Sequence, residues 1–214
     1  MLDDYSVKGL AQRSPLRQAQ ADATRARIVE AATAVLTARG YAGARIEDVA
    51  ATAGVAYPTV YKAFGNKRNL LAAALQSAMT GGAEGAVERQ NWWLEQLHEP
   101  DPARQLRLIA RNARRIYDGA GRLLEVARSA AATHEEIDAV WRKISDERLA
   151  RSRTTARSLA RKTTLRAATR QTSLTLWTLT GPEVYVLQVD RAALSPSGYQ
   201  KWLGETLVAA ILPI

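Results

Sequence analysis

Gly54 separates two short stretches, 46–53 and 57–64, in which apolar residues recur at the spacing of an α-helix. Ala50, Gly54 and Val60 stand at offsets of zero, four and ten along the chain. A helix-turn-helix needs a small residue where its helices cross, a glycine that accepts a positive φ in the turn, and a branched residue that holds the second helix to the core. The spacing therefore predicts a helix-turn-helix.

The second of these helices has an outward face rich in polar and aromatic groups. If Val60 and Phe64 point into the core, the helical period turns four side chains outward: Tyr57, Thr59, Tyr61 and Lys62. The amides and dipole at the start of a helix favour phosphate, so we expect these four residues to contact DNA. We expect further contacts from Lys67, just past the break at 65–66, and from Arg25, near the start of the preceding helix.

The surrounding sequence predicts a small helical domain. A stripe from Ile28 to Leu36 marks a helix that starts near Thr24 and stops at Gly40, and a further helix covers 67–79 with Asn66 as its N-cap. Residues 80–85 contain three glycines, which disfavour a helix, and we place a domain boundary there. The expected organisation is a flexible basic arm over 1–21, a DNA-binding domain over 22–79, and a second domain over 80–214.

The second domain is also predicted to be helical, so the fold class is all-α. Helical stripes cover 106–117 and 135–162, and the stretch 165–179 is apolar on more than one face, as in a helix buried on both sides. A break follows at 181–182, and a closing helix over 196–212 begins after a Ser-Pro pair typical of a helix start. No alternating β pattern occurs along the chain.

Composition restricts the partners of the protein. Thirty basic and twenty-one acidic residues leave a formal charge of +9, which favours an anionic partner such as nucleic acid. There is no cysteine, no long apolar run and no signal-like N-terminus, so we expect a cytoplasmic protein without a membrane partner. Its two histidines are far apart in sequence, and no catalytic set of side chains is recognisable. We therefore expect no metal, no cofactor and no enzymatic activity.

Aromatic residues of the second domain are candidates for lining a ligand pocket. Pockets for small molecules are largely apolar and aromatic, which points to an apolar or aromatic effector. The candidates are Tyr117, Trp141, Trp93 and Trp177. Ordinary core packing is the alternative for each of them, because a buried tryptophan packs well without a ligand.

Three segments of the N-terminal region carry a family resemblance. ARIVEAATAVLTARGY, IEDVAATAGV and TVYKAFGNKRNLL closely resemble the DNA-binding domain of the TetR (tetracycline repressor) family. The final fifty residues are similar to the last three helices of many bacterial, especially actinobacterial, members. The resemblance implies a ligand-responsive one-component transcriptional regulator, which we expect to be a repressor. It implies a homodimer that binds double-stranded DNA at an inverted-repeat operator and is released by a small molecule.

The sequence departs from the family pattern at three positions of the helix-turn-helix. Arg45 stands where a threonine commonly caps the first helix, so a side-chain cap is lost and a cationic phosphate contact is offered. Ala56 replaces a frequent serine cap of the second helix, and Ala63 replaces a histidine or aromatic residue. We therefore add Arg45 to the expected DNA contacts.

The helices over 165–180 and 196–212 have apolar faces that could pair with their copies in a four-helix interface. The expected interface residues are Leu176, Leu179, Trp202, Leu203 and Leu207. Two other functions stay open: a basic helical protein that binds DNA or acidic surfaces without sequence choice, and a helical enzyme acting on an anionic substrate. An activator rather than a repressor is a variant of the first function.

Overall fold

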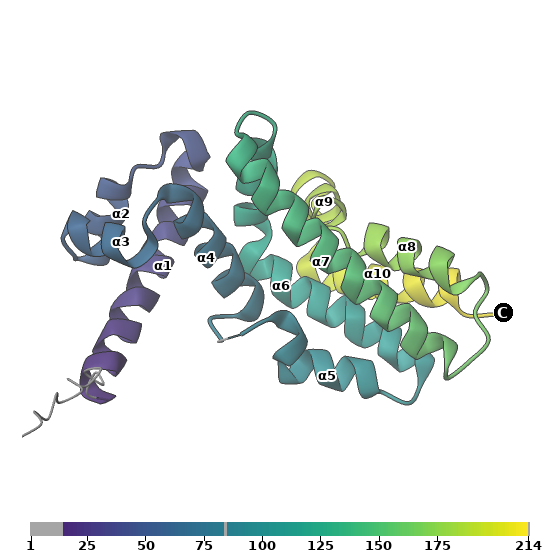
Figure 1. Ribbon diagram of the computed structural model, residues 1–214. Coiled ribbons are helices and arrows are strands. Elements are labelled where there is room, and N and C mark those ends of the chain that lie inside the picture. The colour runs from purple at the N-terminus through teal and green to yellow at the C-terminus, as the bar shows by residue number, and fades with distance from the viewer. Residues whose placement is uncertain (1–14, 84, 214) are drawn as a thin grey trace, which may run out of the picture.

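The computed structural model describes residues 15–83 and 85–213, which contain helices and turns but no strand. Figure 1 shows a small N-terminal group of helices beside a larger C-terminal bundle. The helices run in chain order as α1 (Pro15–Gly43), α2 (Ile46–Ala53), α3 (Tyr57–Phe64), α4 (Lys67–Thr80), α5 (Asn91–His98), α6 (Pro102–Ala131), α7 (Glu135–Ala160), α8 (Thr169–Leu179), α9 (Pro182–Tyr185) and α10 (Pro196–Ile211). The all-α prediction is confirmed.

Helix α1 begins earlier than the sequence pattern predicted. The expected arm over 1–21 lies partly outside the described residues, but Pro15 to Ala21 form the first turns of α1, so the arm prediction is wrong for that part. Proline suits a helix start, and the Leu, Gln, Arg and Ala residues that follow have high helix propensity. All of these residues are exposed, so they carry no apolar stripe by which periodicity could detect the helix. The predicted stop at Gly40 is a break in helical geometry, with φ 69° and ψ 172°.

The predicted caps of the later helices are present. The Asn66 side chain accepts a hydrogen bond of 2.8 Å from the Asn69 amide at the start of α4. Ser195 accepts one of 3.1 Å from the Gly198 amide at the start of α10, with Pro196 in the first turn. Each cap satisfies one of the amides that a helix start leaves without an intrahelical partner.

Helix α8 differs from its prediction in both start and burial. It begins at Thr169 rather than Leu165, because the Arg166 amide bonds to the Ile211 carbonyl of α10 at 2.9 Å, outside any helical pattern. It is also not buried on both sides, since 41% of Leu174 is exposed. Trp92 and Trp93 lie buried in α5.

A buried polar cluster holds the end of α5 against α6 and α7. The Lys162 ammonium donates to the carbonyls of Leu97 and Glu99 and to Oε1 of Gln105, at 3.1, 2.7 and 2.7 Å. Burial lowers the pKa of Lys162 below its ordinary value, because the charged form loses hydration. The three acceptors offset that loss and fix the position of α5.

The two groups of helices meet through more than the α4 connection. Helices α1 and α4 both pack on α6. In addition, the Tyr41 hydroxyl at the end of α1 donates a 2.8 Å hydrogen bond to Glu136 Oε1 in the first turn of α7. Burial, with this acceptor, raises the pKa of Tyr41. Helix α4 continues the chain between the groups, but it is not their sole mechanical link.

Candidate functional site

The turn between α2 and α3 has the geometry that the sequence predicted. Gly54 adopts φ 64° and ψ 39°, and its amide donates to the carbonyls of Ala50 and Ala51. The Val55 amide also bonds to the Ala50 carbonyl, at 3.0 Å. Ala50 and Val60 are buried between the helices. The left-handed turn therefore fixes α3 across α2 with one face free.

The free face of α3 carries the four predicted residues. Tyr57 and Tyr61 are 43% and 57% exposed, and Thr59 and Lys62 are exposed beside them. The two tyrosine rings stack at 6.3 Å between centroids with 25° between their planes. Ala56 provides no side-chain cap, and the Thr59 amide bonds instead to the Ala56 carbonyl at 2.9 Å. The face combines hydroxyls and a cation, which are groups that bind phosphates and base edges.

Arg45 lies at the start of α2 and is exposed. Its side chain does not cap the helix, as we predicted from the replacement of the usual threonine. Its Nε lies 3.6 Å from Glu47 Oε2. Both partners are largely in solvent, where such a pair contributes little. The guanidinium is thus available to an anion beside the α3 face.

Arg25 and Lys67 are engaged within their own domain. The Arg25 guanidinium donates to the Ala63 carbonyl at 2.9 Å and lies 4.2 Å from the centre of the Phe64 ring. The Lys67 ammonium donates to the carbonyls of Tyr41 and Ala44, at 2.7 and 3.1 Å, and lies 4.4 Å from the centre of the Tyr41 ring. Arg25 therefore holds the end of α3 against α1, and Lys67 holds the start of α4 against the end of α1. Contact of Arg25 or Lys67 with DNA stays a prediction.

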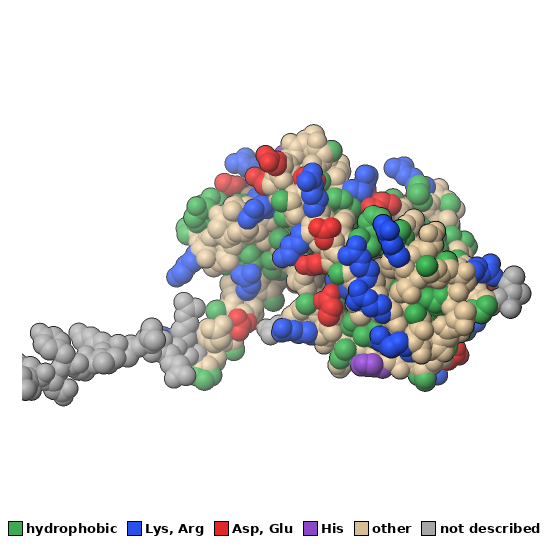
Figure 2. Space-filling view, turned by 45° about the vertical axis from the view of Figure 1, so that its right-hand side comes forward, with side chains coloured by type: hydrophobic (Ala, Val, Ile, Leu, Met, Phe, Trp, Pro, Cys, Tyr) green, Lys and Arg blue, Asp and Glu red, His purple; other side chains and the backbone are tan. Residues whose placement is uncertain are grey.

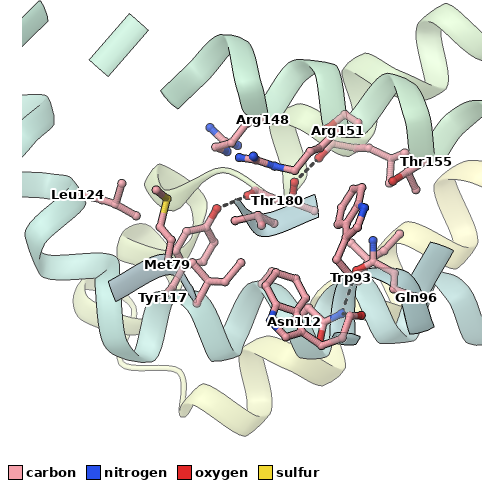
Figure 3. A pocket seen from close by; sticks show the side chains of 17 residues that line it. Met79, Trp93, Gln96, Asn112, Tyr117, Leu124, Arg148, Arg151, Thr155 and Thr180 are labelled. Carbon is pink, nitrogen blue, oxygen red and sulfur yellow. Dashed lines mark hydrogen bonds between the residues drawn. The ribbon is translucent and has the colours of Figure 1, made fainter. Parts of the chain in front are cut away.

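A cavity of about 100 Å³ lies inside the C-terminal bundle (Figure 3). Tyr117 and Met79 lie on one side of it, Trp93 lies opposite, and Arg148 and Arg151 project from α7. The remaining lining residues are Val87, Trp92, Gln96, Ile109, Asn112, Ala113, Ile116, Leu124, Ser152, Thr155, Leu176 and Thr180. The cavity is therefore mainly apolar, with a few polar groups from three helices.

Of the four aromatic residues predicted to line a pocket, the structure brings together two. Trp93 and Tyr117 line the cavity, whereas Trp141 and Trp177 do not. Trp141 is half-buried against the core, and Trp177 lies with its ring centre 5.9 Å from the Arg148 guanidinium carbon. Sequence spacing located these residues on helices but could not show which helix faces converge.

The polar lining groups are held in place by hydrogen bonds. Asn112 Nδ2 donates to the Trp92 carbonyl and to Gln96 Oε1, at 3.2 and 3.0 Å. The Tyr117 hydroxyl donates to the Thr180 carbonyl at 2.6 Å, and burial raises the pKa of Tyr117. Trp92 Nε1 is buried and has no partner in the described part of the chain. The cavity thus includes a residue with an unused buried donor.

Sequence reasoning missed the polar side of this cavity. Arg148 and Arg151 belong to a helix rich in basic residues, and nothing in their spacing distinguishes them from solvated neighbours such as Arg153. Asn112 carried a usable signal, because it is one of the few polar residues inside the apolar stripe of α6 and is buried. A polar residue on a core-facing stripe needs a partner, and that need marks it as a candidate for a site.

The expected dimer residues require a correction. Leu176, Leu203 and Leu207 are buried in the core of their own chain, so they are not on a surface that a second copy could contact. The reason is that α10 lies along α6 and α8 lies along α7, so the apolar residues of both helices face neighbours in the same chain. Leu179 and Trp202 are half-buried and stay candidates for self-association. Leu174 on α8 is an exposed apolar residue that the prediction omitted.

Charged side chains are frequent on the viewed surface. Figure 2 shows many Lys and Arg side chains on the viewed face, with Asp and Glu among them. Some are paired, as Arg142 is with Asp138 at 2.7 Å one helical turn away. No helix within 15–83 or 85–213 has the length and apolar character to cross a membrane. The same residues contain no group of three acidic or histidine side chains placed to hold a metal.

Comparison with known proteins supports the reading of the N-terminal helices. Residues 28–74 match the family model described as "Bacterial regulatory proteins, tetR family". The HTH-type transcriptional repressor SCO4008 of Streptomyces coelicolor is 45% identical over 58 residues. That match covers 27% of this chain and 30% of the repressor, so it spans less than a third of the length of that relative.

Solved structures resemble the whole chain in fold. A TetR-family regulator from Rhodococcus sp. superposes with a TM-score of 0.66 at 15% identity, covering 87% of this chain and 97% of that one. FadR from Bacillus subtilis, solved in complex with stearoyl-CoA, superposes with a TM-score of 0.67 at 19% identity, covering 86% and 97%. At such identities the likeness concerns the fold alone.

Proposed function

We propose that this chain is a homodimeric repressor of the TetR family that a small molecule releases from its operator. The observation that carries the proposal is the free face of α3, which the left-handed turn at Gly54 presents outward. A cavity in the second group of helices supplies a place for the small molecule.

Helix α3 is suited in size and chemistry to the major groove. An α-helix with its side chains is about 10–12 Å across, and the major groove is about 12 Å wide. Tyr57, Thr59 and Lys62 face the DNA in this proposal, and Arg45 binds a neighbouring phosphate. Tyr61 donates its hydroxyl to phosphate, because about half to two-thirds of protein–DNA hydrogen bonds go to the backbone.

A homodimer makes the operator symmetric. One α3 reads one half-site, so a two-fold axis requires two inverted half-sites about 34–36 Å apart, or a multiple of that distance. The outer faces of α8 and α10 are the proposed contact, with Leu174, Leu179 and Trp202 as its apolar residues. The exposure of Leu174 and the partial exposure of the other two support this surface.

Helix α4 connects the cavity to the DNA-binding face. Met79, in its last turn, lines the cavity, and Lys67, at its first residue, bonds to the segment that leads into α2. A ligand that displaces Met79 would tilt α4 and change the separation of the two α3 helices. A coupling of about 1–3 kcal/mol would weaken operator binding roughly 5–150-fold. Rigid cross-linking of α4 to α6 should abolish release, and normal release after cross-linking would refute the tilt.

The first experiment is selection of random duplex DNA by the purified full chain at near-physiological salt, followed by sequencing. Enrichment of an inverted repeat with fixed spacing is the expected result. The Tyr61→Ala variant serves as the matched control and should retain far less of the same DNA. Binding seen at low salt alone, with no enriched site, would favour a basic protein without sequence choice, since such binding rests on phosphate neutralisation.

A further inference from the structure

The lining of the C-terminal cavity restricts the chemical class of its ligand, if the proposed effector role holds. Most of the wall is apolar, and its aromatic side chains come from both α5 and α6. The volume of about 100 Å³ is below the roughly 150 Å³ of an engineered apolar cavity that binds benzene. A ligand of one ring with a small substituent therefore fits only if the lining side chains move outward, and a larger ligand needs a larger movement.

The charged lining groups are all positive. Arg148 and Arg151 line the cavity, and none of the described lining residues is Asp or Glu. The Arg151 side chain is 11% exposed and is neutralised by Glu88, which lies 2.9 Å away outside the lining. One of the two positive charges therefore already has a counterion.

Arg148 is the cation without a close carboxylate. It donates to the Trp177 carbonyl at 2.8 Å, and no carboxylate of the described residues forms an ion pair with it. The nearest charged competitor is Glu183, which flanks Gly181 together with Arg148 but is exposed to solvent. The guanidinium is half-buried and also interacts with the Tyr117 hydroxyl, and its planar fork of five N–H donors retains some for a ligand.

A second group requires an acceptor. Trp92 lines the cavity, is buried, and has no hydrogen-bond partner for its indole Nε1 among the residues described. A buried donor without an acceptor is costly, and a ligand oxygen would remove that cost. The Tyr117 hydroxyl cannot donate a hydrogen bond to the ligand, because it already donates to the Thr180 carbonyl.

We propose that this cavity binds a small monocarboxylate carrying one aromatic ring. The ring lies between Tyr117 and Trp93, and the carboxylate accepts hydrogen bonds from Arg148. A carboxylate matches the planar guanidinium fork better than a neutral amide or alcohol, and a cation of the same shape would face two arginines. The proposal deepens the effector role by assigning it a ligand class.

The test is calorimetric titration of the purified full chain with four compounds of similar size: benzoate, phenylacetate, benzamide and benzylamine. We expect one of the two carboxylates to bind at least about tenfold more tightly than benzamide, because bonds to a charged acceptor are about twice as strong as neutral ones. Benzylamine should not bind. Equal binding of benzoate, phenylacetate and benzamide, or no binding of any carboxylate, would overturn the proposal.

Variants on one helix locate the anion. Arg148→Met should weaken carboxylate binding by about tenfold to a hundredfold and leave benzamide binding unchanged. Arg153→Met is the matched control, since Arg153 is an exposed arginine on the same helix outside the lining. If Arg148→Met does not fold, the carboxylate-to-benzamide ratio of the unaltered chain decides the outcome. Equal loss in both arginine variants would contradict the assigned site.

Operator release separates the two proposals. A carboxylate that binds in the cavity but leaves operator binding unchanged would uphold the ligand class and refute the effector role. If a neutral or cationic ring releases the operator and carboxylates do not, the effector role is upheld and the ligand class is refuted. Both are measured on the same protein with the selected operator.

Discussion

Replacing Lys67 by methionine separates a structural lysine from a DNA-contacting one. The ammonium makes two charge-assisted hydrogen bonds, of 2.7 and 3.1 Å, to carbonyls at the end of α1 and before α2. Hydrogen bonds to charged groups contribute about 1.5–3 kcal/mol each to stability when they are buried. Because Lys67 is half-exposed, the contribution of each of its two bonds is smaller. Methionine keeps the packing of the stem, so the expected loss is about 2 kcal/mol in the free energy of unfolding.

The first assay is unfolding by heat or urea. A loss of about 2 kcal/mol should lower the melting temperature by roughly 4–8 °C for a chain of this length. Lys62→Met is the control, because Lys62 is exposed on α3 and should leave the melting temperature unchanged.

The second assay is the salt dependence of operator binding. Each phosphate contact contributes about 0.9 to the slope of log affinity against log salt. Lys62→Met should lower the slope by about that amount, whereas Lys67→Met should leave it unchanged. A stable Lys67→Met variant with a reduced slope would refute the internal role of Lys67 and restore it to the DNA footprint.

Three further changes test the DNA-binding face and its link to the bundle. Tyr61→Ala should weaken operator binding without lowering the melting temperature, since the ring is mostly exposed; a lower melting temperature would show that the ring is structural. Gly54→Ala should destabilise the chain by about 1–2 kcal/mol in urea unfolding, because φ is 64° there and no neighbour obstructs a methyl group. Tyr41→Phe should cost about 1–2 kcal/mol by removing the bond to Glu136. In a double-mutant cycle, additivity with Glu136→Ala, which removes the acceptor, would disprove that coupling.

The helix-turn-helix could be predicted because its information is local. The offsets of Ala50, Gly54 and Val60 specify a turn and two crossing helices within a dozen residues, and the structure has that turn. The exposed face of α3 followed from the same period. The caps at Asn66 and Ser195 were readable for the same reason, since a cap and its amide lie three residues apart.

Other features could not be predicted because they depend on distant partners. In the sequence, Lys67 looks like an unpaired cation. In the structure it donates a hydrogen bond to the Tyr41 carbonyl, 26 positions away. Leu203 and Leu207 form an apolar stripe that would suit a dimer contact equally well. Packing of α10 on α6 assigns that stripe to the core of the chain itself.

The sequence by itself determined the helical class, the helix-turn-helix and the residues on its outer face, because helical period and glycine conformation act over a few residues. Tertiary structure decided the cavity. Its wall draws on residues from Met79 to Thr180, and most of them are apolar side chains that ordinary core packing would explain as well. Only the convergence of those helices distinguishes Arg148 from its solvated neighbours, since burial and the absence of a counterion are properties of position in space.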